Sequence, residues 1–195
     1  MPLTETNLRR RLKSFRPREL DKTAATPQAA VATILSYALG DPRVLLIRRT
    51  ENERDPWSGH MAFPGGRQDE TDPDLVHTAK RETMEEVHVD LDLGEHLGRL
   101  DDVRGVSRAR TLDLVIVPQV FVLPELVAPI PEKGEVADAL WVPLGPMLRG
   151  ETMTTVRYER DGHVFELPGF RVGDHVVWGL THRMLESLFE VLRGT

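Results

Sequence analysis

Residues 63–89 read FPGGRQDETDPDLVHTAKRETMEEVHV, and this segment carries the most informative pattern of the sequence. It begins as a loop rich in glycine and acidic residues and ends with helical spacing of its apolar residues. We expect the helix to begin with Asp72 as its cap and Pro73 at its first position, where a missing N–H costs nothing. The pattern predicts that the helix runs to about Val87.

The predicted helix separates its acidic residues from its apolar ones. At about 100° per residue, Glu82, Glu85 and Glu86 fall on one narrow face. The neighbouring face should be buried and carries Val76, Ala79, Thr83, Met84 and Val87. Like charges at these spacings repel by about 0.2–0.5 kcal/mol per pair, and the macrodipole disfavours anions near the end of a helix. A hard divalent cation such as Mg²⁺ or Mn²⁺ would turn this repulsion into attraction.

The loop before the helix adds groups suited to a phosphate or metal site. Gly65 and Gly66 permit positive φ and a close approach of the backbone to a ligand. Arg67 can contact an anion, and Arg81 stands at i,i+4 to Glu85, where it can orient that carboxylate. Each feature alone has an ordinary explanation, as a solvated helix face or a simple turn. Their order within one short segment favours a functional site.

On the N-terminal side, the pattern predicts an amphipathic helix over residues 5–16 and a linker that reaches residue 28. Ala29–Leu39 and Arg43–Arg48 are apolar runs separated by a turn sequence, so we expect a hairpin. Residues 50–72 have few apolar runs and are expected to form a long functional loop.

On the C-terminal side, Thr111–Val122 reads as a strand in which Pro118 marks an edge or a bulge. Ala139–Val142 reads as a short strand, and residues 154–178 as two or three more. A final helix, Gly179–Leu192, should bury Leu180, Met184, Leu185, Leu188, Phe189 and Leu192. Strands alternating with a central and a terminal helix indicate a mixed α/β (α+β) domain over residues 29–195.

The composition narrows the function classes. The 195 residues carry a net charge of −6, whereas a nucleic-acid surface normally needs a basic excess. The absence of cysteine excludes thiolate catalysis and cysteine-based zinc sites. No stretch approaches the roughly 18 apolar residues of a membrane span, and the first residues do not resemble a signal peptide. We therefore expect no nucleic-acid partner, no membrane association and a cytoplasmic protein.

The central segment resembles the Nudix box, G-x5-E-x7-R-E-U-x-E-E-x-G-U, in which U is aliphatic. Gly66 matches the opening glycine, and Arg81-Glu82, Glu85-Glu86 and Val89 match the closing half. There are four departures: Asp72 replaces the first Glu, eight residues instead of seven separate it from Arg81, Thr83 takes the first aliphatic position, and His88 replaces the final Gly. The resemblance implies a mixed β-sheet sandwiched between helices.

A narrower resemblance, to the coenzyme A diphosphatases of this superfamily, extends upstream of the box. Their pattern L-L-T-x-R-S-x3-R-x3-G-x3-F-P-G-G is matched by Leu45, Leu46, Arg49, Thr50, Arg54, Gly59 and Phe63-Pro64-Gly65-Gly66. Ile47 and Thr50 are substitutions, and the segment from Arg54 to Gly59 is one residue longer. Val177–Thr181 also resembles that group's I-W-G-x-T.

These resemblances imply the roles of individual residues. Glu82, Glu85 and Glu86 would bind one to three divalent cations, Mg²⁺ or Mn²⁺, with Arg81 orienting them and the Gly66 carbonyl as a further ligand. The acidic cluster or the loop of residues 131–137 would supply a base, with Glu132 and Glu135 as candidates. Both could equally be ordinary solvated acids.

Arginines before the box could hold substrate phosphates. Arg48, Arg49 and Arg54 are the candidates, together with Gly65, Gly66 and Arg67 of the loop; the alternative is that the arginines protect a strand edge. Trp57 and Phe63 could stack on a base, although core packing is the more usual role for a residue such as Phe63.

Three hypotheses follow for the function. The first is hydrolysis of coenzyme A or an acyl derivative to a phosphopantetheine product and adenosine 3′,5′-bisphosphate. The second keeps the metal site and changes the substrate to a nucleotide sugar, a dinucleotide or a nucleoside di- or triphosphate. The third is a catalytically silent nucleotide-binding module. In each, the partner is a small-molecule nucleotide diphosphate, and the apolar terminal helices leave a homodimer open.

Overall fold

The computed structural model describes residues 4–52, 57–106, 111–160 and 162–194. Its centre is a parallel pair of strands, β1 (Gln28–Ser36) and β7 (Thr111–Leu123), paired from Gln28↔Val115 to Ser36↔Leu123. The other strands of this sheet pair antiparallel with their neighbours. The strand order is β3-β2-β1-β7-β5, so the sheet is mixed, as the sequence predicted.

β4 (Gly65–Arg67) and β2 (Arg43–Arg49) both pair with the same edge of β1, so β2 separates from β1 along part of its length, next to the candidate site. β4 pairs with Ala29–Val31, whereas β2 pairs only with Leu35 and Ser36. The predicted hairpin is therefore confirmed at its turn. Beyond the turn β2 diverges from β1 and pairs with β8 (Val136–Pro143) and β3 (Met61–Ala62).

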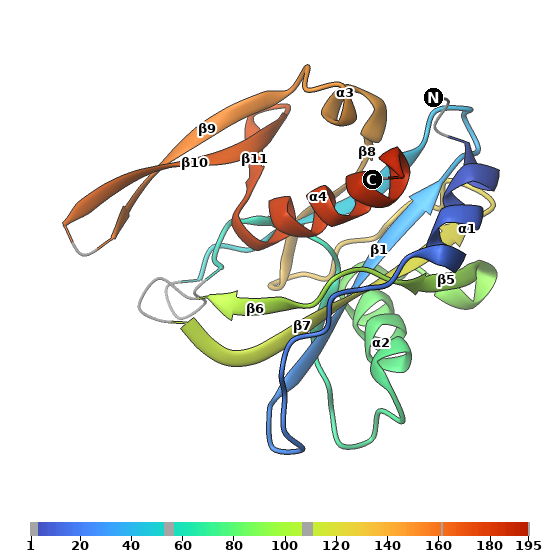
Figure 1. The fold of residues 1–195 in the computed structure, drawn as a ribbon, viewed down its shortest axis with the longest axis horizontal. Coiled ribbons are helices and arrows are strands. Elements are labelled where there is room, and N and C mark those ends of the chain that lie inside the picture. The colour runs from blue at the N-terminus through green and yellow to red at the C-terminus, as the bar shows by residue number, and fades with distance from the viewer. Residues whose placement is uncertain (1–3, 53–56, 107–110, 161, 195) are drawn as a thin grey trace.

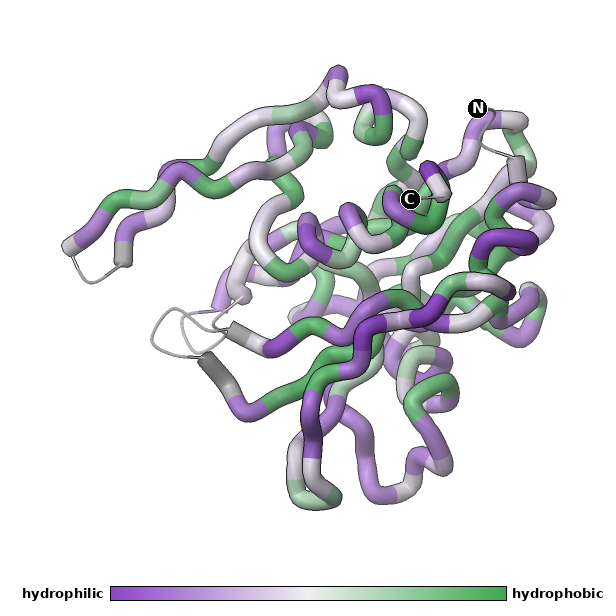
Figure 2. The backbone as a smooth tube through the Cα atoms, viewed as in Figure 1, coloured by the Kyte–Doolittle hydropathy of each residue, from purple (hydrophilic) through white to green (hydrophobic). Residues whose placement is uncertain are grey.

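Helices cover both faces of the sheet (Figure 1). α2 (Leu75–Val87) and the short 3-10 helix η1 (Leu91–Leu93) pack on one face, in a cluster with buried residues of β1 and β2. α1 (Glu5–Ser14) and α4 (Gly179–Arg193) pack on the other. In Figure 2 the hydrophobic residues gather along the central strands and α4, while the outer turns are mostly hydrophilic. The predicted arrangement of a sheet between helices is confirmed.

A second, three-stranded sheet follows a short helix, α3 (Leu144–Leu148). It consists of β9 (Met153–Arg160), β10 (His163–Val172) and β11 (His175–Trp178), in the order β11-β10-β9. The expectation of two or three strands over residues 154–178 is confirmed. β9 and β10 extend away from the rest of the molecule as a hairpin arm, and β11 leads directly into α4 (Figure 1).

Pro118 is not at an edge of the sheet. β7 has β1 on one side and both β5 (Glu95–Arg99) and β6 (Val103–Val106) on the other. The pairing with β5 stops at Gln119, the pairing with β6 begins at Ile116, and between them the carbonyl of Pro118 accepts from the N–H of Leu100 at 3.0 Å. The proline therefore lies where the partner strand changes, and its missing N–H interrupts no ladder.

Several other details differ from the sequence-based expectations. Strands β3 and β4 lie within the segment predicted to be one long loop, and β5, β6 and α3 were not predicted. α2 begins two residues later than expected, because Asp74 is its cap and accepts from the N–H of His77 at 2.8 Å.

The buried face of α2 also differs from the prediction. Met84 is 41% exposed, whereas Glu86 of the same helix is only 4% exposed. The inward face of α2 is thus rotated toward the acidic residues. In α4, Leu180 is only partly buried.

Candidate active site

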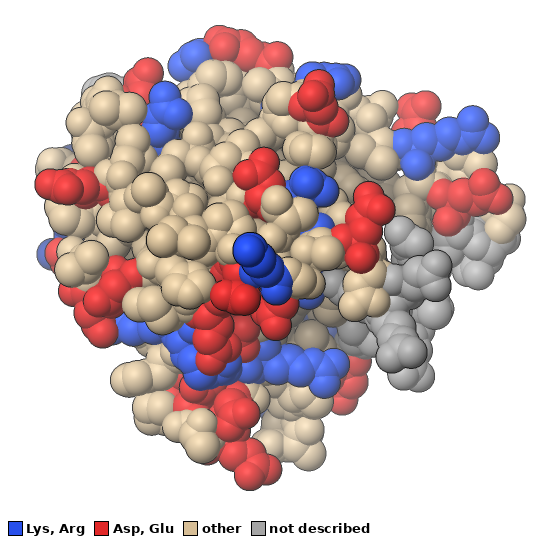
Figure 3. Space-filling view, turned by 180° about the vertical axis from the view of Figure 1, so that it is seen from behind, with Lys and Arg blue, Asp and Glu red and all other residues tan. Residues whose placement is uncertain are grey.

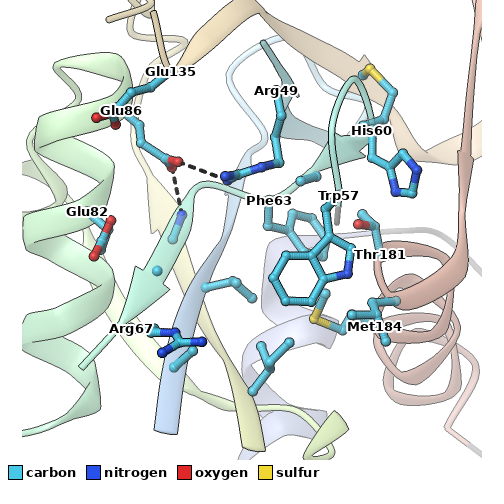
Figure 4. A pocket seen from close by; sticks show the side chains of 18 of the residues that line it. Arg49, Trp57, His60, Phe63, Arg67, Glu82, Glu86, Glu135, Thr181 and Met184 are labelled. Carbon is cyan, nitrogen blue, oxygen red and sulfur yellow. Dashed lines mark hydrogen bonds and ion pairs between the residues drawn. The ribbon is translucent and has the colours of Figure 1, made fainter. Parts of the chain in front are cut away.

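A cavity of about 490 Å³ opens between α2 and α4. Its acidic wall comes from α2, β4 and the turn before β8, and its opposite wall from Trp57, β11 and α4 (Figure 4). The lining residues are Ala29, Val31, Arg49, Thr50, Asn52, Trp57, His60, Met61, Ala62, Phe63, Gly65, Gly66, Arg67, Glu82, Glu86, Ile116, Gly134, Glu135, Trp178, Leu180, Thr181 and Met184. The cavity therefore joins a charged half to an apolar half.

Glu86 is the most buried carboxylate of the acidic wall. The N–H of Gly65 donates to its Oε2 at 2.8 Å, and Nη1 of Arg49 lies 3.6 Å from its Oε1 (Figure 4). Burial raises the pKa of Glu86 to about 7, against the opposing effects of the Gly65 N–H and Arg49, and the charges of Glu82 and Glu135 raise it further. Desolvation thus outweighs the two stabilising contacts.

Glu82 lies one turn before Glu86 and faces the same cavity. Its pKa is raised by burial, which outweighs its hydrogen bond to Arg81, and the charges of Glu85 and Glu135 add to the effect. Glu85 is different, because its side chain is 55% exposed and it does not line the cavity. The three predicted metal-binding acids thus comprise a buried one (Glu86), a partly buried one (Glu82) and a more exposed one (Glu85).

The two glycines of β4 serve different purposes. A Cβ on Gly66 would overlap with the carboxylate of Glu82, so the missing side chain leaves that carboxylate its place. A Cβ on Gly65 would instead overlap with backbone atoms of Ala30 and Val31, and its φ of +149° favours glycine. Gly66 therefore accommodates an acidic side chain of the cavity, and Gly65 allows β4 to approach β1.

Arg81 links the loop to the acidic face of α2. Its Nη1 donates to Glu82 at 2.9 Å and to Glu85 at 3.0 Å, and its other guanidinium nitrogens donate to both oxygens of Asp72 at 3.0 and 2.8 Å. The Arg81 guanidinium holds the pKa of Asp72 well below its usual range. The predicted orienting contact with Glu85 is present, and Asp72 anchors this arginine instead of capping the helix.

The loop before β8 brings one of its two acids to the cavity. Glu132 lies against the end of α2, where its N–H donates to the carbonyl of Glu86 at 2.8 Å and its carboxylate lies 3.9 Å from His88. Glu135 follows one turn later and lines the cavity beside Glu86 (Figure 4). Of the two candidate bases, only Glu135 is therefore within the cavity.

The predicted phosphate-binding arginines separate on the structure. Arg49 and Arg67 line the cavity, whereas Arg48, the neighbour of Arg49 on β2, does not. Successive side chains of a strand point to opposite faces, so these two could not both reach the site. Arg54 lies outside the described residues.

The opposite wall is apolar and aromatic. Trp57, Phe63 and Met184 face the acids across the cavity (Figure 4). The rings of His60 and Trp178 are 4.6 Å apart, which joins the loop after β2 to the start of α4. Phe63 is 2% exposed and belongs to the hydrophobic core, whereas Trp57 is only partly buried. Trp178 and Thr181 also line the cavity. The sequence singled them out only as a match to the I-W-G-x-T pattern and gave them no role, because nothing in their local pattern indicates which cavity they face.

The acidic wall suits a divalent cation. Within the described residues, no three Asp, Glu or His side chains are already arranged around a single point, and Arg81 holds Glu82 and Glu85. The donor chemistry nevertheless fits, because Glu82, Glu86 and Glu135 line one cavity and bring hard oxygen donors with excess negative charge to it.

Comparison with known proteins agrees with this geometry. The family model described as NUDIX domain matches residues 26–158. A protein named mitochondrial coenzyme A diphosphatase NUDT8, from Homo sapiens, is 32% identical over 87% of this chain and 71% of its own length. The uncharacterized protein C14C4.10c of Schizosaccharomyces pombe is 38% identical over 60% of this chain, but the match spans only 37% of that protein.

A solved structure supports the fold. The NUDIX domain of Shewanella oneidensis NrtR, complexed with ADP ribose, aligns over 93% of this chain and 90% of its own, with a TM-score of 0.53 and 22% identity. No helix in the described ranges is long and apolar enough to cross a membrane. On the face shown in Figure 3, acidic and basic side chains are interspersed, and the band of basic side chains in the lower half of this view is bordered by acidic ones.

Proposed function

The chain belongs to the Nudix hydrolase family, and from that premise we propose that it cleaves the diphosphate of coenzyme A or an acyl derivative. The products would be a phosphopantetheine, free or acylated, and adenosine 3′,5′-bisphosphate. One observation carries this proposal: a single cavity joins an acidic half, suited to a cation and diphosphate, to an apolar and aromatic half suited to the rest of the substrate. The human relative's name and the residues from Leu45 to Gly66 support the choice of coenzyme A.

Glu82, Glu85, Glu86 and the Gly66 carbonyl would hold Mg²⁺ or Mn²⁺. A cation bound there would neutralise charge on the diphosphate and lower the pKa of the attacking water. Arg81 keeps Glu82 and Glu85 in place through its hydrogen bonds and is in turn fixed by Asp72. Glu135 lies beside this cluster and would accept a proton from the water.

The basic residues of the cavity would hold the substrate. Arg49 and Arg67 face the same space as the acids and can donate forked hydrogen bonds to phosphate oxygens. Gly65 and Gly66 let the backbone approach the diphosphate. Arg48 does not line the cavity, so we assign it no contact with the substrate. The contribution of Arg54 stays a prediction.

The apolar wall would take the part of the substrate beyond the diphosphate. Trp57 is partly exposed and presents its ring to the cavity opposite the acids (Figure 4). A planar base stacked on it would lose little conformational freedom, whereas a flexible chain loses about 0.5–1.5 kcal/mol for each part that it immobilises. We therefore place the adenine ring against Trp57.

A second substrate class stays open because of one local feature. The segment from Arg54 to Gly59 is one residue longer than in the coenzyme A diphosphatase pattern, and it carries Trp57. One additional residue there would shift the position of the Trp57 ring. The shifted ring could suit another nucleotide, such as a nucleotide sugar, a dinucleotide or a nucleoside di- or triphosphate. A silent nucleotide-binding module is disfavoured by the presence of Arg81, Glu82, Glu85 and Glu86.

A panel of diphosphate substrates tests the proposal. The purified chain is incubated with Mg²⁺ or Mn²⁺ and each substrate, and the products are separated by chromatography. Release of adenosine 3′,5′-bisphosphate from coenzyme A supports the leading proposal. Turnover of other diphosphates alone selects the second class, and tight binding without turnover selects a silent module. The cytoplasmic location stays a prediction, since the human relative is named as mitochondrial.

A further inference from the structure

The hairpin arm has an unpaired edge. In the three-stranded sheet β10 lies between β11 and β9, so among the described residues β9 has a strand partner on one side only. Val164 and Phe165, near the tip of the arm, are 49% and 46% exposed. A two-stranded hairpin is only marginally stable by itself in water, and an open edge readily accepts another strand. The edge of β9 is therefore a surface on which a partner would add stability.

The pairing of β9 with β10 identifies the backbone groups on this open edge. Thr155 lies opposite Pro168, which has no N–H, so this pair cannot be one that exchanges two hydrogen bonds. Because hydrogen-bonded and non-hydrogen-bonded pairs alternate, Arg157 and Glu159 are also in non-hydrogen-bonded pairs. The N–H and C=O groups of Thr155, Arg157 and Glu159 therefore point away from β10, toward the open edge.

The charged side chains on this edge are complementary to the same side chains of a second copy. Arg157 and Glu159 are exposed, lie on the same face of the strand and flank Tyr158. If two copies of β9 pair antiparallel about Tyr158, each Arg157 lies opposite Glu159 of the other copy, so two opposite-charge pairs form. The outward-facing backbone groups match in the same register. Shifting the axis to Arg157 or to Glu159 also matches the backbone groups, but it places like charges directly opposite each other.

The same pattern argues against a purely protective role for these charges. Side chains of one sign on an edge repel a second copy in every register. Here the signs are mixed, and one register turns both cross-strand contacts into attractions. Opposite charges facing each other across strands contribute about 0.2–1 kcal/mol per pair, and like charges destabilise by a similar amount.

We propose that two copies of this chain associate through β9, paired antiparallel with Tyr158 on the two-fold axis. The resulting sheet continues from one arm into the other and covers both open edges. The interface also adjoins the candidate active site, since the ring of Tyr158 lies 5.5 Å from that of Trp178, which lines the cavity. This proposal does not depend on the identity of the substrate.

Cross-linking tests the register directly. The chain contains no cysteine, so Tyr158→Cys introduces its only thiol. In a non-hydrogen-bonded antiparallel pair the Cα atoms are about 4.5 Å apart, which is within the range of a disulfide. Under mild oxidation we expect most of this variant to migrate as a covalent dimer on a non-reducing gel. Thr155→Cys, which is not opposite itself in this register, should stay largely monomeric. Equal cross-linking of the two variants would contradict the register.

Charge reversal tests the interface without oxidation. Arg157→Glu and Glu159→Arg should each weaken the dimer about fourfold or more, because each turns two attractive pairs into repulsive ones. The double variant restores opposite charges and should regain the wild-type dissociation constant. Arg183→Glu, an exposed position on α4, makes the same charge change away from β9 and should have no effect. Analytical ultracentrifugation measures all five proteins. A monomeric wild-type chain, or a double variant as weak as the single ones, would overturn the proposal.

Discussion

At the scale of single residues, Glu86 occupies an unusual place for a carboxylate. It is almost fully buried, accepts one backbone N–H and lies beside Arg49, yet burial still raises its pKa to about 7. Glu82 and Glu135 add negative charge around it. Burying a carboxylate costs free energy that an apolar side chain at this position would not cost, and such groups are typical of functional sites. We therefore expect a bound cation to neutralise the negative charge of this site.

The first prediction concerns the charge of Glu86. Glu86→Gln should lower turnover at least about 100-fold, because a neutral amide is a poor ligand for a hard cation. The fold should survive, since the amide oxygen can still accept the N–H of Gly65. Steady-state kinetics with Mg²⁺ or Mn²⁺ and circular dichroism measure the two effects. Activity close to wild type would remove Glu86 from the mechanism.

The second prediction concerns the pH dependence of stability without metal. The pKa of Glu86 is about 7 in the folded chain and about 4.3 in the unfolded one, so the folded state binds more protons between these values. The free energy of unfolding should therefore fall as the pH rises through this window. Glu82, whose pKa is also raised by burial, adds to this fall, whereas burial lowers the pKa of His182, which opposes the fall below about pH 6.5. The lowered pKa of Asp72 acts only in acid, below about pH 4.

Urea denaturation at pH 5.5 and pH 8 in the presence of a chelator measures this slope. In Glu86→Gln the fall in stability should be clearly smaller, because the group with the pKa of about 7 is gone and only Glu82 still contributes a raised pKa. The same slope in both proteins would show that another group is responsible.

The third prediction separates the two glycines of β4. Gly66→Ala should lower activity at least about tenfold with little change in stability, because the methyl group displaces only the flexible end of Glu82. Gly65→Ala should instead destabilise the fold, since its methyl group meets the backbone of β1 and its φ is positive. Thermal denaturation and kinetic assays on both variants test this contrast. An equal loss of stability in both would contradict it.

At the scale of elements, α2 shows how far the sequence could predict the site. The spacing of Glu82, Glu85 and Glu86 correctly predicted a helix that carries them, and His88 ends it in the left-handed conformation, where the Nudix pattern has Gly. The predicted start of the helix was wrong, because Asp72 and Asp74 are both good N-cap residues and only tertiary contacts select between them. Asp72 is drawn away by Arg81 and by the hydroxyl of Thr78, at 2.9 Å.

The rest of the site depends on contacts between distant segments, and these leave no local pattern. Glu135 and Glu132 looked equivalent in the sequence. The loop before β8 hydrogen-bonds to the end of α2 at Glu132 and then turns, which brings Glu135 and not Glu132 to the cavity. Arg48 and Arg49 are separated only by the alternation of β2. Strands β5 and β6 are short and polar in part, so their alternation was too weak to recognise.

The fourth prediction compares the two aspartates before α2. Asp74→Ala removes the helix cap and should cost about 0.5–2 kcal/mol of stability with nearly normal activity. Asp72→Asn keeps the shape but removes the charge that holds Arg81, so it should lower kcat more than it raises KM. Urea denaturation and steady-state kinetics on both variants measure this. A similar kcat in the two variants would remove Asp72 from its supporting role.

At the scale of the whole molecule, the N-terminal segment is packed against the body. Leu8 of α1 is fully buried in the cluster that α4 forms on the sheet, and Arg9 forms an ion pair with Glu95 at 2.7 Å. The linker is held as well, since the N–H of Leu20 donates to Asp102 at 3.0 Å. The proposed boundary at residue 29 thus separates parts that share one hydrophobic core.

The fifth prediction follows from this packing. Leu8→Ala should destabilise the whole domain by about 2–5 kcal/mol, because it leaves a cavity in the shared core. Leu39→Ala, at a position that is 65% exposed, is the matched control and should change stability by less than about 0.5 kcal/mol. Urea denaturation of both variants gives the difference. A negligible effect of Leu8→Ala would mean that the packing of α1 contributes little to the stability of the body.

The parallel pairing of β1 with β7 also determines when the molecule can take shape. Gln28 pairs with Val115, so the centre of the sheet forms only when the chain between these two residues closes into a long loop. Such long-range loop closure slows folding. On the ribosome, α2 is synthesised well before β7, and residues such as Phe121 that belong to its packing surface are added late. The packing surface of the acidic helix is therefore complete only after the nascent chain has grown past Leu123.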